Sequence, residues 1–271
     1  MLKILCPTDF SEISNNAIAY AAKFAKNADG DLTLFYVESM HEETNKEILR
    51  GKSMTLEAET ERLEEICREV SAVFSISCYS EIQPSNDSLS KVISAKAEDF
   101  DLIIMGTNGA DDFYKNFTGS NTYKVIKSTS VPVLYIPPGY HYSPVNAIVY
   151  AFDYLHDYKL PIEQLRLLID KFKCKLTVLL VTGHLDWNKE YELKEIQRQI
   201  KNVYWDEISM DFETIQEDKI AESIEKFVQE NDVDLLALCT HHYSSWESLF
   251  HKSVIKDISS KANFPVFVFH K

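Results

Sequence analysis

Short apolar runs alternate with amphipathic stretches along the first half of the chain, and each apolar run has the length of a buried strand. The runs that we predict as strands are residues 2–6, 32–37, 73–79, 102–105 and 131–136. The stretches with helical spacing of apolar residues follow Ser11, which is a candidate N-cap, span 45–70 and 85–97, and follow Ser120. Strands that alternate with helices predict βαβ units, whose right-handed crossovers give a parallel sheet covered on both faces.

The same pattern restarts after a turn-rich segment, PPGYHYSP at 137–144. Further strands are predicted at 147–152, 176–181, 203–208 and 264–269. Further helices are predicted at 160–172, 187–200 and 221–228, the second of which is shorter than its counterpart in the first half. We therefore predict an α/β protein of two domains, residues 1–140 and 145–271, each a five-stranded, mainly parallel sheet with helices on both faces.

An internal repeat without gaps supports this division. An offset of 133 residues maps DFDLIIMGTN, which starts at Asp99, onto DVDLLALCTH, which starts at Asp232. The same offset pairs further identical residues, namely Thr107 with Thr240, Phe117 with Phe250, Ser120 with Ser253, Pro132 with Pro265 and Val133 with Val266. This identity over a strand and the region that follows it indicates duplication of a whole domain.

Three of the seven glycines in the chain cluster after the fourth apolar run, at Gly106, Gly109 and Gly119, and Ser120 follows them. Glycine permits positive φ and a close approach of the backbone to a ligand, so this cluster before a helix predicts an anion site. The backbone N–H groups of Ser120 and Asn121, with the Ser120 hydroxyl, are candidates to bind phosphate oxygens. The alternative is that these glycines only shape turns.

The full spacing G-x2-G-x9-G-S resembles the motif of the nucleotide-binding members of the universal stress protein family. The resemblance covers nearly the entire chain, as a tandem of two such domains. It implies a Rossmann-like fold of the adenine nucleotide α-hydrolase type in each half. It also implies ATP or AMP as the ligand, with magnesium as an optional companion.

The resemblance assigns a set of nucleotide-binding positions. The residues that match the adenosine-contacting and adjacent positions are Pro7, Thr8, Asp9, Val37, Met105 and Gly106, and those that match the phosphate-facing positions are Gly109, Gly119, Ser120, Asn121 and Thr122. For Asp9 alone, a local role at the helix entry is the competing interpretation. No catalytic residue and no metal ligand is predicted.

Two departures from the family pattern bear on this site. Asn121 stands where the family usually has a small apolar residue, which is tolerated if only its backbone N–H is used. Gln83-Pro84-Ser85 lacks the glycine that many members place after the third strand. The second departure predicts a narrowed or reshaped pocket mouth.

The second half has lost the glycines of the motif, because Cys239, His242 and Lys252 replace them at the 133-residue offset. Their side chains would crowd a phosphate, so we expect the nucleotide in the N-terminal half only. Asp153 and Ser253 survive, although both have structural uses. The histidines His241, His242 and His251 suggest a metal site, but adjacent loop histidines usually point apart, and a filled, partly polar pseudo-site is the preferred interpretation.

Charge and cysteine content narrow the function classes. The formal net charge of −14 argues against nucleic acid and anionic membrane partners. The five cysteines are dispersed, which is typical of reduced core thiols in a cytoplasmic protein, and a redox switch is the alternative. No apolar run is long enough to cross a bilayer, and the strand at 2–6 leaves no room for a signal peptide.

The spacing of polar residues favours a binding module over an enzyme. The glycine loop lacks the G-K-(S/T) of a P-loop, and no Ser/His/Asp set or paired carboxylates emerge. We expect a stress-linked ATP or AMP sensor; the alternatives are a slow ATPase or adenylate-handling enzyme and a nucleotide-independent scaffold that acts through the C-terminal half. The resemblance further implies an intramolecular pseudo-dimer that pairs 131–136 with 264–269, a possible homodimer, and an unknown protein partner.

Overall fold

A computed structural model of the protein describes residues 1–39, 56–107, 121–152, 161–183, 187–204, 208–240 and 263–270. The described residues fall into two compact units. The first unit ends at Tyr142 and the second begins at Ser143. The division therefore lies inside the turn-rich segment 137–144.

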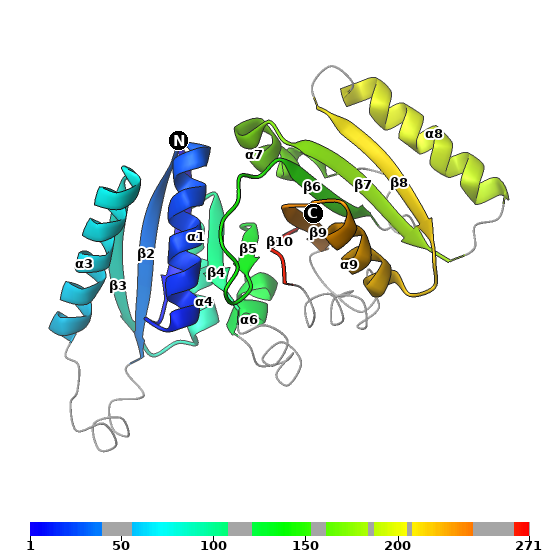
Figure 1. The fold of residues 1–271 in the computed structure, drawn as a ribbon. Helices are drawn as coiled ribbons and strands as arrows, with labels where there is room; N and C mark the ends of the chain where they lie inside the picture. Colours follow the sequence, from blue (N-terminus) through cyan, green and yellow to red (C-terminus); the bar gives the residue numbers. More distant parts are fainter. Residues whose placement is uncertain are drawn as a thin grey trace. The chain divides into compact units, whose positions relative to one another are not determined.

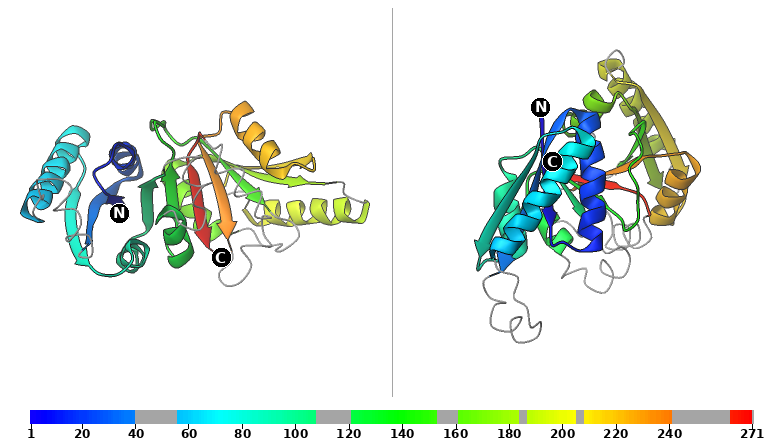
Figure 2. Two further views of the ribbon diagram at one scale, coloured as in Figure 1. Left: turned by 90° about the horizontal axis from the view of Figure 1, so that it is seen from below. Right: turned by 60° about the vertical axis from the view of Figure 1, so that its left-hand side comes forward.

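The first unit is a parallel sheet of five described strands with helices on both faces. Its elements are β1 (Leu2–Thr8), α1 (Glu12–Ala28), β2 (Gly30–Ser39), α3 (Leu56–Phe74), β3 (Cys78–Ser85), α4 (Leu89–Ala97), β4 (Leu102–Gly106), α6 (Asn121–Ser128) and β5 (Val133–Ile136). The strand order is β3-β2-β1-β4-β5, and each neighbouring pair is parallel. Helices α1 and α3 cover one face and α4 and α6 the other (Figures 1 and 2).

The second unit repeats this architecture. Its elements are β6 (Ala147–Phe152), α7 (Ile162–Phe172), β7 (Lys175–Thr182), α8 (Trp187–Tyr204), β8 (Met210–Gln216), α9 (Ile220–Glu230), β9 (Leu235–Thr240) and β10 (Val266–His270). The strand order is β10-β9-β6-β7-β8, again with each neighbouring pair parallel, and α7 and α9 lie on opposite faces (Figure 1). Both units are thus Rossmann-like, which confirms the predicted fold class.

The central strands hold the core of each unit. The side chains of β4 from Leu102 to Met105 are all buried, and β5 is buried along its whole length. A parallel strand covered on both faces needs apolar residues at every position, which is why these strands appear as continuous apolar runs in the sequence. Figure 2 shows helices on both sides of each sheet.

The internal repeat extends to an aspartate that fixes the start of the fourth strand in each unit. In the first unit, Asp101 Oδ2 accepts a hydrogen bond from the Lys3 backbone N–H at 2.8 Å. In the second unit, Asp234 Oδ2 accepts from the backbone N–H groups of Asn146 at 2.8 Å and Ala147 at 3.0 Å. The strands after these aspartates begin at Leu102 and Leu235, which is the offset found in the sequence. The duplicated copies therefore share this clamp.

The predicted position of the third strand in each half was wrong. Residues 73–79 and 203–208 were expected to be strands, but α3 continues to Phe74, α8 continues to Tyr204, and the strands begin later, at Cys78 and Met210. The apolar residues at the helix ends resemble a strand, whereas the outer strands β3 and β8 contain only half-buried and exposed positions and carry acidic residues. Helix α8 is accordingly longer than expected, and Gln83-Pro84-Ser85 belongs to β3 instead of a loop after it.

The entry of α1 shows the predicted N-cap. The Ser11 side chain accepts a hydrogen bond from the Ser14 backbone N–H at 3.2 Å. Helix α4 also begins after a serine, Ser88, but the side chain of Ser88 makes no capping hydrogen bond. The two helices offer a matched comparison of a serine that caps and a serine that does not.

We expect Ser11→Ala to lower the free energy of unfolding of the first unit by about 1 kcal/mol, since it removes a capping hydrogen bond. The control Ser88→Ala should change it by less than about 0.5 kcal/mol, because no cap is lost. Urea titrations followed by far-UV circular dichroism measure both. Equal effects of the two substitutions would contradict the assignment of Ser11 as the functional cap.

The segment after β5 returns onto α1. The Asn16 side-chain amide donates hydrogen bonds to the backbone oxygens of Pro137 at 3.3 Å and Tyr140 at 3.4 Å. The ring of Tyr142 meets the Tyr20 ring edge-on, with centroids 5.1 Å apart, and lies 6.5 Å from the Phe24 ring. This segment thus covers apolar surface of α1.

Candidate functional site

The carboxyl ends of β1, β2 and β4 lie at the same edge of the first sheet. Thr8 at the end of β1 is in register with Tyr36 of β2, and the parallel register of β1 with β4 pairs Leu5 with Ile103. The chain proceeds from β1 outward to β2 and later returns to β4 on the other side of β1. The gap between the ends of β1 and β4 is therefore a topological switch point, where open α/β sheets bind ligands.

Asp9 lies at this switch point, directly after β1, and its side chain is exposed. Its Oδ1 atom accepts a hydrogen bond from the Ser11 backbone N–H at 3.0 Å. Desolvation raises the pKa of the Asp9 carboxyl, but hydrogen bonds from Ser11 and Ser14 outweigh it, so the pKa lies below its usual value. Asp9 is therefore a charged acceptor at neutral pH, and its local bond occupies only part of its accepting capacity.

Thr8 has a structural role in the same turn. Its buried hydroxyl accepts from the Phe10 backbone N–H at 3.1 Å and donates to Ser14 Oγ at 3.1 Å. These bonds hold Phe10 with a positive φ of 61°, a conformation that costs energy for a side chain with a Cβ. The turn thereby directs Phe10 away from the path of a regular strand. Pro7, the preceding residue, is half-buried within β1.

An aromatic and charged cluster surrounds Phe10, and no motif or periodicity in the sequence signals it. The Phe10 ring lies 4.9 Å from the Tyr36 ring, and the Arg62 guanidinium lies 4.5 Å above the Phe10 ring. The Tyr36 hydroxyl donates to Glu59 Oε1 at 2.9 Å. Helix α3 contributes Glu59 and Arg62, so this helix forms one wall beside the carboxyl edge.

Acidic groups gather around Tyr36 at this edge. Burial raises the pKa of the Tyr36 hydroxyl, and its hydrogen bond to Glu59 and the charges of Glu59, Glu38 and Asp9 raise it further. Tyr36 is thus a neutral hydroxyl close to three carboxylates. Glu59 Oε2 is buried and has no hydrogen-bond partner within the described ranges. The edge therefore offers acceptors, which suit N–H and O–H donors of a ligand better than phosphate oxygens.

Met105 and Val37 flank the switch point from β4 and β2. Met105 is buried and pairs in register with Tyr135, whereas Val37 is half-buried and pairs with Gln83. Of these two residues, Val37 is therefore partly accessible at the surface, whereas the side chain of Met105 is not.

Gly106 has a packing reason for lacking a side chain. A Cβ atom added there would lie 2.7 Å from Ile13 Cγ2 and 2.8 Å from the Ile13 backbone oxygen. The first turn of α1 thus packs directly against the end of β4. At this position the glycine is required by the protein itself, whatever the ligand.

Residues 1–137 match the sequence model of the universal stress protein family, which is half of the chain. The chain belongs to the universal stress protein family. A universal stress protein of Methanocaldococcus jannaschii is 26% identical over 137 residues, which cover 49% of this chain and 81% of the relative. These matches confirm the family resemblance inferred from the glycine motif.

Solved structures of universal stress proteins share the fold of the entire chain. The structure from Archaeoglobus fulgidus has a TM-score of 0.74 at 19% identity and covers 99% of this chain and 96% of its own. A putative universal stress protein of Pseudomonas aeruginosa has a TM-score of 0.66 at 16% identity, with coverages of 99% and 92%. The two-unit fold of this universal stress protein therefore recurs in proteins of similar length.

Several predicted positions of this universal stress protein fall outside the described residues. They are Gly109, Gly119 and Ser120 in the first half and Asp153, His241, His242, His251, Lys252 and Ser253 in the second. Asn121 and Thr122 are the first residues of α6, so their backbone lies at a helix N-terminus. Within the described ranges, no group of three His, Cys, Asp or Glu side chains is arranged to hold a metal ion. None of the described helices is long and apolar enough to span a membrane.

Proposed function

We propose that the first unit of this universal stress protein binds an adenine nucleotide, ATP or AMP, and acts as a nucleotide-responsive regulatory module. The observation that carries the proposal is the exposed, charged carboxylate of Asp9 at the switch point between β1 and β4. The strand beside it leads into the G-x2-G-x9-G-S segment of the sequence. The fold directs a ligand to this edge, and the motif supplies the preference for phosphate.

The charges at the edge support one orientation of the nucleotide. Asp9, Glu38 and Glu59 are acceptors and would repel phosphate, but they suit the hydroxyl groups of a ribose and the amino group of a base. The helix α6 begins at Asn121, and a helix N-terminus favours negative charge. We infer that the nucleoside lies beside β1 and β2 and the phosphates lie toward the glycine segment and α6.

We propose that only the first unit binds the nucleotide. In the second unit, β9 carries Cys239, whose side chain is buried, at the position equivalent to Gly106. In the sequence, His242 and Lys252 occupy the positions of the other two glycines. Side chains at these positions remove the close backbone approach that a polyphosphate needs.

A calorimetric titration of the full chain with ATP and with AMP tests the proposal. We expect Gly119→Lys, which copies the residue of the second half, to weaken ATP binding at least about tenfold, which corresponds to about 1.4 kcal/mol. Ser253→Ala, in the second half, is the matched control and should leave the affinity unchanged. Equal affinities of the wild type and Gly119→Lys for ATP would contradict the proposal of a nucleotide-responsive module.

A second pair of variants separates the ligand role of Asp9 from its local role. Asp9→Asn keeps an oxygen that accepts from the Ser11 N–H but removes the charge, whereas Asp9→Ala removes both. Loss of affinity in both variants with an unchanged denaturation midpoint for Asp9→Asn supports a direct contact. A loss of stability without loss of affinity would reduce Asp9 to a helix-entry residue.

We propose a binding module, with slow ATP hydrolysis as the alternative. Magnesium, if it takes part, would arrive with the phosphates of the nucleotide. Turnover assays with magnesium and ATP test the alternative: sustained phosphate or pyrophosphate release that is lost in Asp9→Ala would establish an enzyme. The cytoplasmic location, the pairing of 131–136 with 264–269 and a homodimer stay predictions.

A further inference from the structure

Two cysteines of the first unit lie with their sulfur atoms 3.2 Å apart. Cys67 is on α3 and Cys78 is the first residue of β3, and 11 positions of sequence separate them. Both are free thiols. A disulfide has an S–S bond of about 2.05 Å, so a small movement of the two side chains would join them. The sequence pattern, with no C-x-x-C, did not indicate this pair.

The surroundings of the pair make the two sulfurs chemically different. The Cys78 thiol donates to Cys67, and the Leu34 backbone and Ser80 add hydrogen bonds. The bond from Cys78 lowers the pKa of Cys67, against the opposing effects of burial and of the Glu64 charge. The same bond, burial and the nearby Cys67 and Cys6 raise the pKa of Cys78. Cys67 therefore ionises first, and Cys78 holds the proton.

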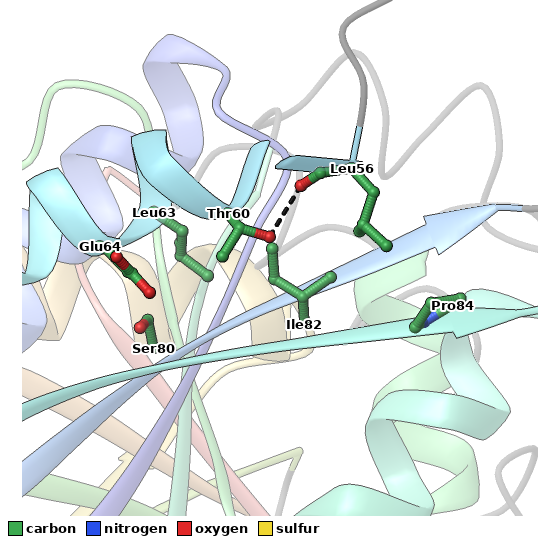
Figure 3. A pocket seen from close by; sticks show the side chains of 7 residues that line it. All are labelled: Leu56, Thr60, Leu63, Glu64, Ser80, Ile82 and Pro84. Atoms are coloured by element: carbon green, nitrogen blue, oxygen red, sulfur yellow. Dashed lines mark hydrogen bonds between the residues drawn. The ribbon is translucent and has the colours of Figure 1, made fainter. Parts of the chain in front are cut away.

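A groove between α3 and β3 gives access to this part of the unit. It has a volume of about 310 Å³ and is lined by Leu56, Thr60, Leu63, Glu64, Ser80, Ile82 and Pro84. Figure 3 shows Glu64 and Ser80 together at one end of the groove and Leu56 and Pro84 at the other. Ser80, which hydrogen-bonds Cys67, thus also faces the groove. Cys67 is buried and does not itself line the groove, whereas Cys78 is half-buried, so we expect a small polar oxidant to reach the pair past Ser80.

We propose that Cys67 and Cys78 form a redox-active pair that a peroxide oxidises to an intramolecular disulfide. The Cys67 thiolate attacks one peroxide oxygen and breaks the O–O bond, which gives a sulfenic acid and, with hydrogen peroxide, one water after protonation. The Cys78 sulfur then attacks the Cys67 sulfur, forms the S–S bond and displaces the sulfenic oxygen as a second water. Two thiols lose two electrons, and one peroxide gains them.

Two further described cysteines, Cys6 and Cys174, are weaker candidates for the first reaction with peroxide. Burial raises the pKa of Cys6 to about 12 and that of Cys174 to about 11, so both are protonated at neutral pH. Cys174 belongs to the second unit, whereas Cys67 and Cys78 belong to the first. The thiolate is the form that reacts with peroxide, which makes Cys67 the favoured first site. The charge of Cys67 adds to the rise in the pKa of Cys6, so the two groups are close neighbours and Cys6 is the competitor that a test must distinguish.

Oxidation of the full chain with hydrogen peroxide, followed by alkylation and thiol counting under denaturing conditions, tests the proposal. We expect loss of two of the five thiols, with recovery by dithiothreitol. Trypsin cleaves after Arg62, Arg68 and Lys91, so the disulfide joins two separate peptides, 63–68 and 69–91, which mass spectrometry detects. After peroxide treatment, the Cys67→Ser and Cys78→Ser variants should each form no disulfide, whereas Cys174→Ser should still lose two thiols.

Three outcomes would overturn the proposal. They are a peptide that links Cys6 to Cys67 or Cys78 in place of the expected pair, oxidation of Cys67 to sulfinic acid without linkage, and an unchanged thiol count after peroxide. Cys78→Ser changes a half-buried residue at a strand end, so it provides a folded comparison even if Cys67→Ser proves unstable. Circular dichroism of each variant before oxidation confirms that the fold is retained.

Discussion

Replacement of Asp234 by alanine is expected to lower the free energy of unfolding of the second unit by about 2–3 kcal/mol. The half-buried Asp234 side chain accepts from two backbone N–H groups, those of Asn146 and Ala147, and from the Ser143 hydroxyl at 3.3 Å. Alanine leaves these donors without their partner at the point where β6 and β9 begin. A hydrogen bond to a charged acceptor contributes about 1.5–3 kcal/mol. Because Asn146 is exposed, water replaces part of its bond in the variant, so the total loss is smaller than the sum over all the bonds to Asp234.

The duplicated chain supplies the control for this substitution. Asp101 holds the equivalent position, but it is exposed and accepts one backbone N–H, that of Lys3, so Asp101→Ala should cost about 1 kcal/mol in the first unit. All three tryptophans, Trp187, Trp205 and Trp246, belong to the second half. Tryptophan fluorescence in a urea titration therefore reports the second unit. A shift of its midpoint in Asp101→Ala, or none in Asp234→Ala, would contradict this account of the clamp.

Replacement of Gly106 by valine is expected to destabilise the first unit by about 2–3 kcal/mol. The added Cβ would meet both the Ile13 side chain and the Ile13 backbone oxygen at less than 3 Å, and a backbone atom cannot move without shifting α1. Helix α1 packs on β1 and β4, so the strain spreads through the core of the unit. Far-UV circular dichroism, compared with tryptophan fluorescence, separates this loss from effects on the second unit.

Two further variants locate the strain at Gly106. Ile13→Ala in the Gly106→Val background should restore only part of the stability, because the Ile13 backbone oxygen stays at 2.8 Å from the added Cβ. Gly139→Ala is the control for a glycine with positive φ, 71°, and open space around it, and should cost about 1 kcal/mol. Full recovery in the double variant would show that the backbone contact is unimportant.

The fold followed from the sequence where burial is complete. The strands β1, β4, β5 and β6 are apolar runs because both faces of these parallel strands are covered, and their predicted positions agree with the structure. The prediction of the outer strands β3 and β8 failed because one edge of each strand is uncovered, so charged residues are tolerated there and the apolar pattern is lost. The helix before each of them ends in apolar residues, so the local pattern placed the strand too early.

The candidate site was predictable only where a motif carried it. Asp9 was assigned because it matches the family's acidic position after the first strand, but the cluster of Phe10, Tyr36 and Arg62 depends on a positive φ at Phe10 that no periodicity signals. Gly106 was interpreted as a position where the backbone approaches a ligand closely. The structure adds a second reason for the glycine, because a side chain there would collide with Ile13. The pairing of Cys67 with Cys78 arises from the packing of α3 on β3, which spacing along the chain does not reveal.

The return of 137–142 onto α1 bears on how the first unit can be studied in isolation. The family match ends at residue 137, yet Tyr140 and Tyr142 lie against the Tyr20 ring, and Asn16 binds the backbone of this segment. A polypeptide cut at the family boundary would leave aromatic surface of α1 open to water and prone to self-association. One that runs through Tyr142 carries its own cover.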